Sequence, residues 1–244
     1  MKSKTLLIGE FLMGTRENFE NHCWRDVMPE EDLRTYAPYA RETKVGARPG
    51  LLVIDLYNLV YKGGAKPPHE LDKDFPNSCG IYAHNAIEPT KELISCCREE
   101  GLPIFYITAQ FSPHRVKSTK RRGIELTAHD CEIHDAFAPE PEDLVLRKER
   151  PSSFFGTPLI AHLNERGVDS LIVCGESTSG CVRASVLEGH MLGKHISVVE
   201  ECVFDRSELI HKVNLFDMHH KYADVMNLSD VKEQLINQRF AKVA

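Results

Sequence analysis

Cys181 stands where an apolar segment gives way to a helical pattern. The strand formers Leu171-Ile172-Val173 are followed by a turn at Gly175, a small polar loop and a helix predicted over 182–192, which the cysteine opens. A thiol at a helix N-terminus meets the positive end of the helix dipole and unpaired backbone N–H groups, and both favour the nucleophilic thiolate. The same N–H groups suit a developing oxyanion. The position indicates a catalytic nucleophile; the alternative is a free cysteine that packs as a small apolar residue.

Two further reactive side chains lie at or near the ends of predicted strands. Asp55 follows the apolar run 51–54, so we expect it to be partly desolvated and to need a partner, because an unpaired buried charge is costly. Lys148 closes the run 144–147. In parallel α/β sheets, ligands bind beyond the carboxyl ends of the strands. The plainer alternatives are that Asp55 caps the next turn through Asn58 and that Lys148 is an exposed lysine. Sequence spacing alone does not join these residues to Cys181.

The elements that would position these side chains alternate between strands and helices. Strands are expected over 51–56, 103–108, 144–147, 170–174 and 195–199, and helices over 87–98, 158–166 and 182–192. This alternation predicts an α/β fold in which helices flank a doubly wound, mainly parallel sheet with right-handed crossovers. We expect one domain over 49–244. Residues 1–48 carry many charges, Trp24 and no clear strand, which predicts a partly helical arm over the core or over a neighbouring subunit.

Composition narrows the class of protein. The 244 residues suffice for one large domain, and 42% hydrophobic and 27% charged residues are typical of a soluble protein. A net charge of −6 and a pI near 6.1 argue against a nucleic-acid binder. Eight cysteines are an even number, but a chain of this size does not need a disulfide framework. The apolar segment 5–12 is short and is interrupted by Glu10, so it predicts neither a signal peptide nor a membrane span. We therefore expect a cytoplasmic protein with reduced thiols.

Three motifs, in order, resemble those of the isochorismatase-like cysteine hydrolases. They are Ile54-Asp55-Leu56-Tyr57-Asn58, Lys148-x-Arg150-Pro151-Ser152-Ser153-Phe154-Phe155-Gly156-Thr157 and Gly175-x-Ser177-Thr178-Ser179-Gly180-Cys181-Val182-Arg183-Ala184-Ser185. The tail, with Asp205-Arg206-x-Glu208, Asn214-Leu215-Phe216-Asp217-Met218 and Lys221-Tyr222-Ala223-Asp224-Val225, is similar to the branch of N-carbamoylsarcosine and maleamate amidases. The resemblance extends from about residue 40 to the end of the chain.

The resemblance implies a catalytic triad of Asp55, Lys148 and Cys181. Cys181 would attack an amide or ureido carbonyl to form a thioester, and Asp55 would pass the thiol proton to the leaving nitrogen and then activate water. Lys148 would hold the thiolate and the carboxylate in their charged forms. The backbone N–H groups of Cys181 and Ser177 would form the oxyanion hole. Members of this family commonly have a cis peptide at the position of Glu176–Ser177.

Some positions depart from the family pattern. Glu176 stands where relatives more often carry a small or apolar residue, so its carboxylate must point away from the thiolate, be paired or select the substrate. The nicotinamidase branch has an Asp-x-His metal motif where this chain has Gln110-Phe111-Ser112. His114 alone is a poor metal site, so no metal or cofactor is expected. Isochorismatases proper, which cleave a vinyl ether, generally lack the cysteine.

The remaining candidates have weaker signals. We predict Asn58, Gln110, Phe154 and Glu176 as substrate-binding residues, with Phe154 either a pocket wall or part of the core. The basic segment His114–Arg122 is either a solvated loop or the source of an arginine that clamps a substrate carboxylate. His219-His220 are interpreted as structural or interfacial, and Cys96-Cys97 as helix packing.

Together these features predict a cofactor-free cysteine amidohydrolase that acts on a small linear amide or N-carbamoyl compound and releases ammonia. Alternatives within the same chemistry are maleamate-type and biuret- or triuret-type amidases. The alternative from another class is a catalytically silent binding or assembly module. The expected partners are a small-molecule substrate and further copies of the chain, with a homotetramer implied by the resemblance and no nucleic acid or membrane.

Overall fold

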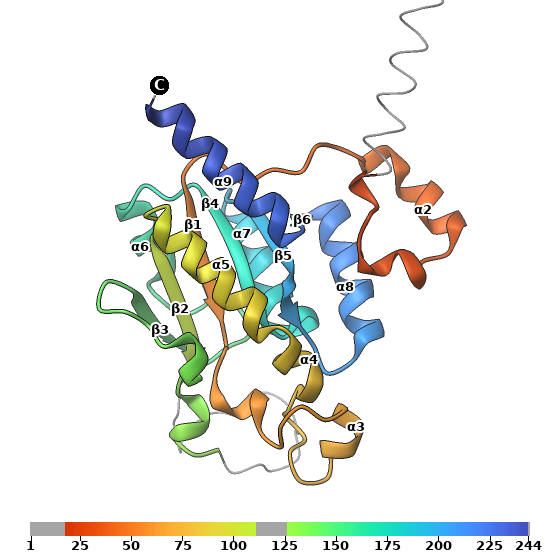
Figure 1. Ribbon diagram of the computed structural model, residues 1–244, viewed down its shortest axis with the longest axis vertical. Coiled ribbons are helices and arrows are strands. Elements are labelled where there is room, and N and C mark those ends of the chain that lie inside the picture. Colours follow the sequence, from red (N-terminus) through yellow and green to blue (C-terminus); the bar gives the residue numbers. More distant parts are fainter. Residues whose placement is uncertain (1–17, 111–125, 244) are drawn as a thin grey trace, which may run out of the picture.

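A six-stranded sheet forms the centre of the molecule (Figure 1). The computed structural model describes residues 18–110 and 126–243. The strands are β1 (Pro49–Ile54), β2 (Ile104–Ala109), β3 (Leu144–Lys148), β4 (Ser170–Glu176), β5 (His195–Phe204) and β6 (Asp224–Met226). They lie in the order β3-β2-β1-β4-β5-β6, and every neighbouring pair is parallel. The predicted doubly wound parallel α/β sheet is confirmed.

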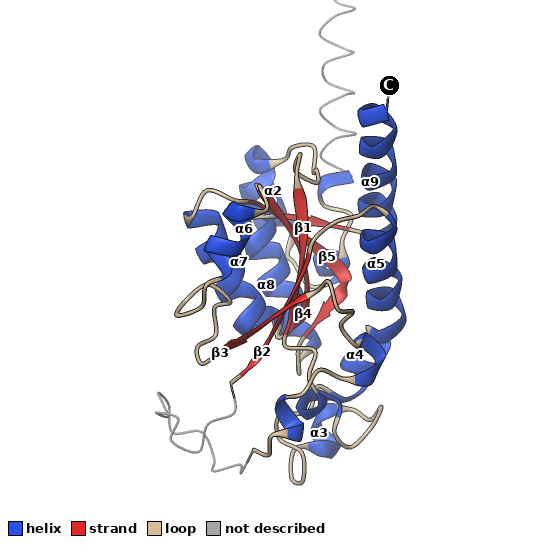
Figure 2. Cartoon of the chain, turned by 90° about the vertical axis from the view of Figure 1, so that its left-hand side faces the viewer, coloured by secondary structure: helices blue, strands red, loops and turns tan. Residues whose placement is uncertain are grey.

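Helices cover both faces of this sheet. Their bounds are α2 (Glu30–Tyr36), α3 (Pro68–Leu71), α4 (Gly80–Asn85), α5 (Ile87–Glu99), α6 (Leu159–Glu165), α7 (Arg183–Met191), α8 (Glu208–Lys221) and α9 (Leu228–Val243). Figure 2 shows α4, α5 and α9 on one side of the strands and α6, α7 and α8 on the other. No helix in the described part of the chain is both long and apolar enough to cross a membrane.

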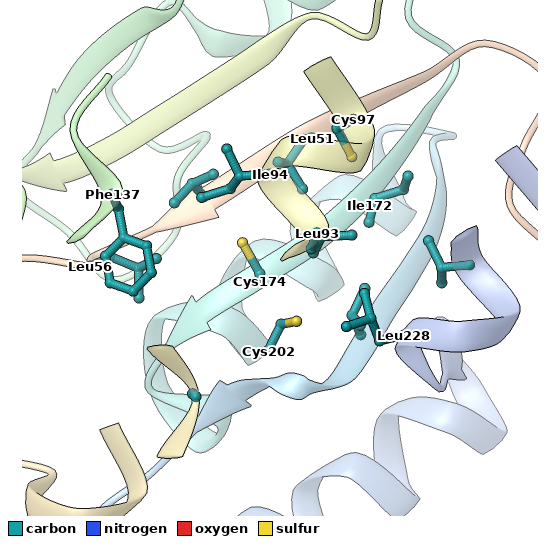
Figure 3. Packing of buried hydrophobic residues seen from close by; sticks show 14 of the residues in the cluster. Leu51, Leu56, Leu93, Ile94, Cys97, Phe137, Ile172, Cys174, Cys202 and Leu228 are labelled. Atoms are coloured by element: carbon teal, nitrogen blue, oxygen red, sulfur yellow. The ribbon is translucent and has the colours of Figure 1, made fainter. Parts of the chain in front are cut away.

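Two apolar clusters, one on each face, hold the layers together. All six residues of β1 are buried, and Leu51 contributes to one cluster while Leu52 contributes to the other. This alternation explains why the strand is a continuous apolar run: both of its faces are covered. Figure 3 shows Leu93 of α5 and Leu228 of α9 in the first cluster. Cys96 and Cys97 are buried in the same cluster, which confirms their packing role.

Strand β5 continues well beyond its expected end at Val199. The apolar pattern breaks at Glu200 and Glu201, but the strand runs on to Phe204. Both carboxylates have partners in other segments: Glu200 accepts from the backbone N–H of Cys23 at 3.0 Å, and Glu201 accepts from the N–H of Leu228 at 2.9 Å. Tertiary contacts therefore stabilise a strand that its own pattern does not predict.

The described part of the N-terminal segment, residues 18–48, packs against α8. Trp24 is fully buried and contacts Phe216. The imidazole of His220 lies 2.9 Å from the Glu20 carboxylate, and that of His219 lies 3.0 Å from the carbonyl oxygen of Phe19. The two adjacent histidines therefore have the structural role expected for them. Residues 1–17 of the predicted arm lie outside the described residues.

Candidate active site

The strand order reverses between β1 and β4, and the two strands approach closely there. Ile54 is paired with Gly175, which has a φ of 113°. A Cβ at Gly175 would lie 1.9 Å from the carbonyl oxygen of Ile54, so only glycine fits. Asp55 directly follows β1, and Glu176 is the last residue of β4. Such a switch point is where open α/β sheets bind their ligands.

The three residues predicted as a triad meet at this point. Nζ of Lys148, at the end of β3, lies 2.5 Å from Oδ2 of Asp55 and 3.2 Å from Sγ of Cys181. Asp55 is fully buried and Lys148 is 5% exposed, so the ion pair is shielded from water. Asp55 has a φ of 53°, and its N–H donates to the Ile107 carbonyl at 2.8 Å. The structure thus brings together three side chains that sequence spacing left unconnected.

Burial and the neighbouring charges shift the pKa values of Lys148 and Cys181. Burial favours the neutral amine of Lys148, but the negative charge of Asp55 and the sulfur of Cys181 outweigh it and raise the pKa of Lys148. Burial also raises the pKa of Cys181, and Asp55 adds to this through its charge and as acceptor for the thiol, against the opposing effect of Lys148. In the resting site Lys148 is therefore cationic and Cys181 is a thiol. This differs from the expected lowering at a helix start, because burial and Asp55 dominate.

The loop that carries Cys181 winds into a wide, π-type helical turn, Thr178–Val182, before α7 begins. The Glu176–Ser177 peptide bond at its start is cis. The carbonyl of Ser177 accepts from the N–H of Gly180 at 2.8 Å and from that of Val182 at 3.2 Å. A Cβ at position 180 would lie 2.5 Å from Oγ of Ser177, so a larger residue there would require this hydroxyl to move. These contacts hold Ser177 and Cys181 on one compact turn.

Two side chains not predicted from the sequence fix this loop from outside. Oδ2 of Asp205, at the end of β5, accepts from the N–H of Ser179 at 2.8 Å and from its hydroxyl at 2.6 Å. Ser185 of α7 donates to the Cys181 carbonyl at 2.7 Å and accepts from the N–H of Ser153 at 2.9 Å. Ser153 lies in the segment that follows Lys148. The loop that carries Cys181 is therefore hydrogen-bonded both to the end of β5 and to the segment that follows Lys148.

Glu176 is buried within this cluster. It is 4% exposed, its Oε1 accepts from the Tyr57 hydroxyl at 3.1 Å, and its Oε2 lies 3.8 Å from the thiol of Cys79. Burial and the charge of Asp55 raise the pKa of Glu176 to about 7, against the opposing effects of Arg206, Lys148 and Tyr57. Of the alternatives expected for this carboxylate, pairing within the protein is the one that its contacts support.

Two of the predicted substrate-binding residues make backbone hydrogen bonds in the segments that follow β2 and β1. The N–H of Gln110 donates to the Lys148 carbonyl at 2.8 Å, so it extends the pairing of β2 with β3. The N–H of Asn58 donates to Glu132, and its side-chain amide donates to the carbonyl of His129 at 3.1 Å. Asn58 therefore fastens the loop around residue 129 to the strand end that carries Asp55.

Phe154 is not placed with this group. It is 5% exposed and belongs to the apolar cluster beneath α6 and α7, where its ring lies against Gly189. Of the two predictions for this residue, the structure supports core packing rather than a pocket wall. The basic segment His114–Arg122 lies outside the described residues. Among the residues that are described, no group of three or more His, Cys, Asp or Glu side chains is arranged to hold a metal ion.

Comparison with known proteins identifies the family. The model of the isochorismatase domain matches residues 49–230. The chain belongs to the isochorismatase family. The match covers every strand of the sheet and all three triad positions. The resemblance inferred from the motifs is therefore confirmed at the level of the family.

Relatives within the isochorismatase family have amidase names. The chain is 33% identical over 202 residues to the maleamate amidohydrolase of Pseudomonas putida, which covers 78% of this chain and 88% of that protein. It is 29% identical over 208 residues to the N-carbamoylsarcosine amidase of an Arthrobacter species, covering 81% and 75% of the two chains. An isochorismatase family protein from Burkholderia thailandensis has the same fold, with a TM-score of 0.68 at 21% identity over 80% of this chain and 100% of that one. The chain is therefore a hydrolase of this family with amidase-named relatives.

Proposed function

We propose that the chain is a cysteine amidohydrolase that cleaves a C–N bond of a small linear amide or N-carbamoyl compound and releases ammonia. One observation carries the proposal: the Lys148 ammonium contacts both the Asp55 carboxylate and the Cys181 sulfur at a buried switch point. A nucleophile, a proton acceptor and a cation within contact distance are the components that covalent catalysis of acyl transfer requires. The amidase names of the relatives support the same chemistry.

The first half of the reaction forms a thioester. The Cys181 thiol transfers its proton to Asp55 as the sulfur attacks the carbonyl carbon, and the carbonyl oxygen becomes an oxyanion. The backbone N–H groups of Ser177 and Cys181 stabilise this oxyanion from the compact turn that carries both residues. When the intermediate collapses, the C–N bond breaks and Asp55 returns the proton to the leaving nitrogen, which departs as ammonia. Lys148 keeps the charge of the site balanced while the proton moves.

The second half regenerates the enzyme. Asp55, again a carboxylate, removes a proton from water, and the resulting hydroxide attacks the thioester carbonyl. The C–S bond then breaks, the sulfur regains a proton from Asp55, and the acid product leaves. An N-carbamoyl substrate gives a carbamic acid, which loses carbon dioxide to yield an amine, whereas a simple amide gives a stable carboxylic acid. We include Asn58, Gln110 and Glu176 in the proposed substrate-binding set, because they adjoin the strand ends that carry the triad.

Ammonia release tests the proposal. Wild-type protein is assayed with an N-carbamoyl amino acid, with maleamate and with biuret, and we expect turnover of at least one of them. Cys181→Ala should abolish it. Cys23→Ala is the matched control, because Cys23 is the other half-exposed cysteine of the chain and should leave the rate unchanged. Turnover by Cys181→Ala would refute the mechanism, and no ammonia from any substrate class would favour a binding module.

Maleamate-type deamidation is the second candidate. The Pseudomonas putida relative bears that name and matches most of this chain. Maleamate differs from a carbamoyl substrate because its products are ammonia and a stable dicarboxylate. Carbon dioxide release, measured beside ammonia in the same assay, therefore separates the two candidates.

We also propose that the protein is cytoplasmic and forms a homo-oligomer. The resemblance to the family implies a tetramer. All eight cysteines are free, which supports a reducing compartment. Leu209, Ile210 and Val213 of α8 are exposed apolar side chains, which supports burial against another subunit. Sedimentation equilibrium would test the oligomer: a monomer at micromolar concentration would contradict it.

A further inference from the structure

The buried carboxylate of Glu176 is a charge for which the triad mechanism has no use. Glu176 follows Gly175, and Asp55 follows Ile54, the residue paired with that glycine. Asp55 directly follows β1 and Glu176 ends β4, so the two residues lie at the same level on neighbouring strands. Glu176 also raises the pKa of Cys181 through its charge, so it lies within electrostatic reach of the sulfur. The inference that follows rests on the proposed function, because it concerns the substrate that this sulfur attacks.

The hydrogen bonds of Glu176 leave acceptor capacity unused. Oε1 accepts one bond from the Tyr57 hydroxyl, while Oε2 accepts one from the Cys79 thiol at 3.8 Å among the residues that the structure describes. A thiol is a weak donor, whereas a carboxylate has sites for about four hydrogen bonds. Glu176 forms no ion pair within the described residues: Lys148 is paired with Asp55, and Arg206 acts on Glu176 only at longer range. A buried carboxylate with so few donors is costly unless a ligand supplies more.

We propose that Glu176 accepts N–H groups from the far end of the substrate, and thereby selects neutral amides and ureides over compounds that carry a carboxylate at that end. Among the proposed substrate classes, it therefore favours biuret-type compounds over maleamate and N-carbamoyl amino acids. A terminal carboxamide or ureido group presents N–H donors to Oε2. A carboxylate presents none, and its charge would repel that of Glu176 at close range in a desolvated site.

Substrate pairs that differ only at the far end test this selection. Succinamide is compared with succinamate, and N-carbamoylglycinamide with N-carbamoylglycine. We expect wild-type kcat/KM to favour the neutral member of each pair on the order of 100-fold. Glu176→Gln keeps the shape and the acceptor for Tyr57 but removes the charge, so the preference should fall at least about tenfold. Glu142→Gln makes the same chemical change at an exposed glutamate and should leave the preference for the neutral substrate unchanged.

Alkylation of Cys181 provides a readout that does not depend on amidase activity. Iodoacetamide and iodoacetate differ by the same exchange of carboxamide for carboxylate, and mass spectrometry quantifies the modified Cys181 peptide. Asp55 and Lys148 are present in every variant, so their effects on this rate ratio cancel when the variants are compared. We expect the ratio of the iodoacetamide rate to the iodoacetate rate to fall about tenfold in Glu176→Gln and to stay unchanged in Glu142→Gln.

The two experiments separate the two proposals. If no amide releases ammonia but the alkylation ratio falls in Glu176→Gln, the proposed function fails and the charge selection by Glu176 stands. If ammonia is released and neither ratio depends on Glu176, the function stands and the inference fails. A wild-type preference for the carboxylate member of each pair also overturns the inference, because it would mean that a cation, and not Glu176, receives the far end.

Discussion

One oxygen of the Asp205 carboxylate accepts hydrogen bonds from both the backbone N–H and the hydroxyl of Ser179. Ser179 lies two residues before Cys181, and Asp205 is the first residue after β5. The end of a core strand therefore fixes the position of the proposed nucleophile relative to Asp55 and Lys148. Charge-assisted bonds to a buried carboxylate are among the stronger hydrogen bonds in proteins.

Replacing Asp205 by Ala should lower kcat more than it changes KM, because the loop would hold Cys181 away from the attack geometry. A displacement of about 1 Å can cost on the order of 100-fold in rate. Ser207→Ala is the control: Ser207 accepts from the N–H of Ile210 at the start of α8, and it should affect thermal stability with little effect on kcat. A lower melting temperature with unchanged kcat in Asp205→Ala would mean that Asp205 is only structural.

Lys148→Met should destabilise the fold by about 3–5 kcal/mol, because it leaves the buried Asp55 carboxylate without its cation. Urea denaturation followed by circular dichroism measures this loss. The double variant Asp55→Asn with Lys148→Met should recover most of it, since a neutral pair needs no counter-charge. Additive effects of the two single substitutions would contradict the ion pair.

Asp55→Asn should increase the alkylation rate of Cys181 at neutral pH and at the same time abolish ammonia release. The negative charge of Asp55 raises the pKa of the thiol, and Lys148 opposes it, so removing Asp55 favours the thiolate. Lys148→Met should do the reverse and move the alkylation profile to higher pH. Iodoacetamide rates across neutral and alkaline pH measure both shifts. A parallel loss of alkylation and turnover in Asp55→Asn would contradict this description.

The preference for neutral substrates should grow as the pH rises through about 7, the value to which burial and Asp55 raise the pKa of Glu176. Below that pH Glu176 is protonated and tolerates a carboxylate; above it the side chain is charged and repels one. The groups that act on it are Asp55 after β1, Tyr57 beyond it, Cys79 before α4, Lys148 on β3 and Arg206 after β5. Ratios of kcat/KM for succinamide and succinamate should follow this profile in the wild type and be flat in Glu176→Gln.

Acid should release the N-terminal segment before the core unfolds. Burial disfavours the charged form of Glu20, but hydrogen bonds with His220 and Trp24 outweigh it and lower the pKa of Glu20. Its stabilising effect is therefore present above its unfolded pKa of about 4.3 and is lost as the pH falls through the lower folded value. Trp24 is the one tryptophan of the sequence, so its fluorescence reports this segment directly.

In an acid titration, the Trp24 emission should shift to the red at a higher pH than the loss of far-ultraviolet circular dichroism. Glu20→Gln should show part of that shift already at neutral pH. Glu31→Gln, on the exposed side of α2, should behave like the wild type. Coincident transitions by both probes would show that the segment and the core unfold together.

Elements buried on both faces were among those that the sequence pattern could predict, as were the partly exposed edge strand β3 and the helices α5, α6 and α7. β1, β2 and β4 are continuous apolar runs, and their expected bounds differ from the structure by only a few residues. The end of β5 was not predictable, because Glu200 and Glu201 look like surface residues until their partners are placed. β6 spans only Asp224–Met226, too few residues for a periodic signal.

The candidate site was predictable in part. Asp55 stands out as a carboxylate directly after an apolar strand, and Asp205 carries the same signal after Val203-Phe204, although its role was missed. Nothing in the sequence indicates that Cys79 faces Glu176, because helix packing brings its thiol to the strand ends. The proton affinity of Cys181 was also misjudged, since it depends on the burial and charges of residues remote in sequence.

The contact between Gly175 and Ile54 determines which positions of this loop tolerate substitution and which do not. A side chain at position 175 would collide with the backbone of β1, so the path of the chain into the nucleophile turn is set by the sheet itself. The next residue, Glu176, carries a side chain that is hydrogen-bonded to the side chains of Tyr57 and Cys79. An engineer who wished to retarget this enzyme would therefore keep 175 as glycine and diversify 176 together with its two neighbours.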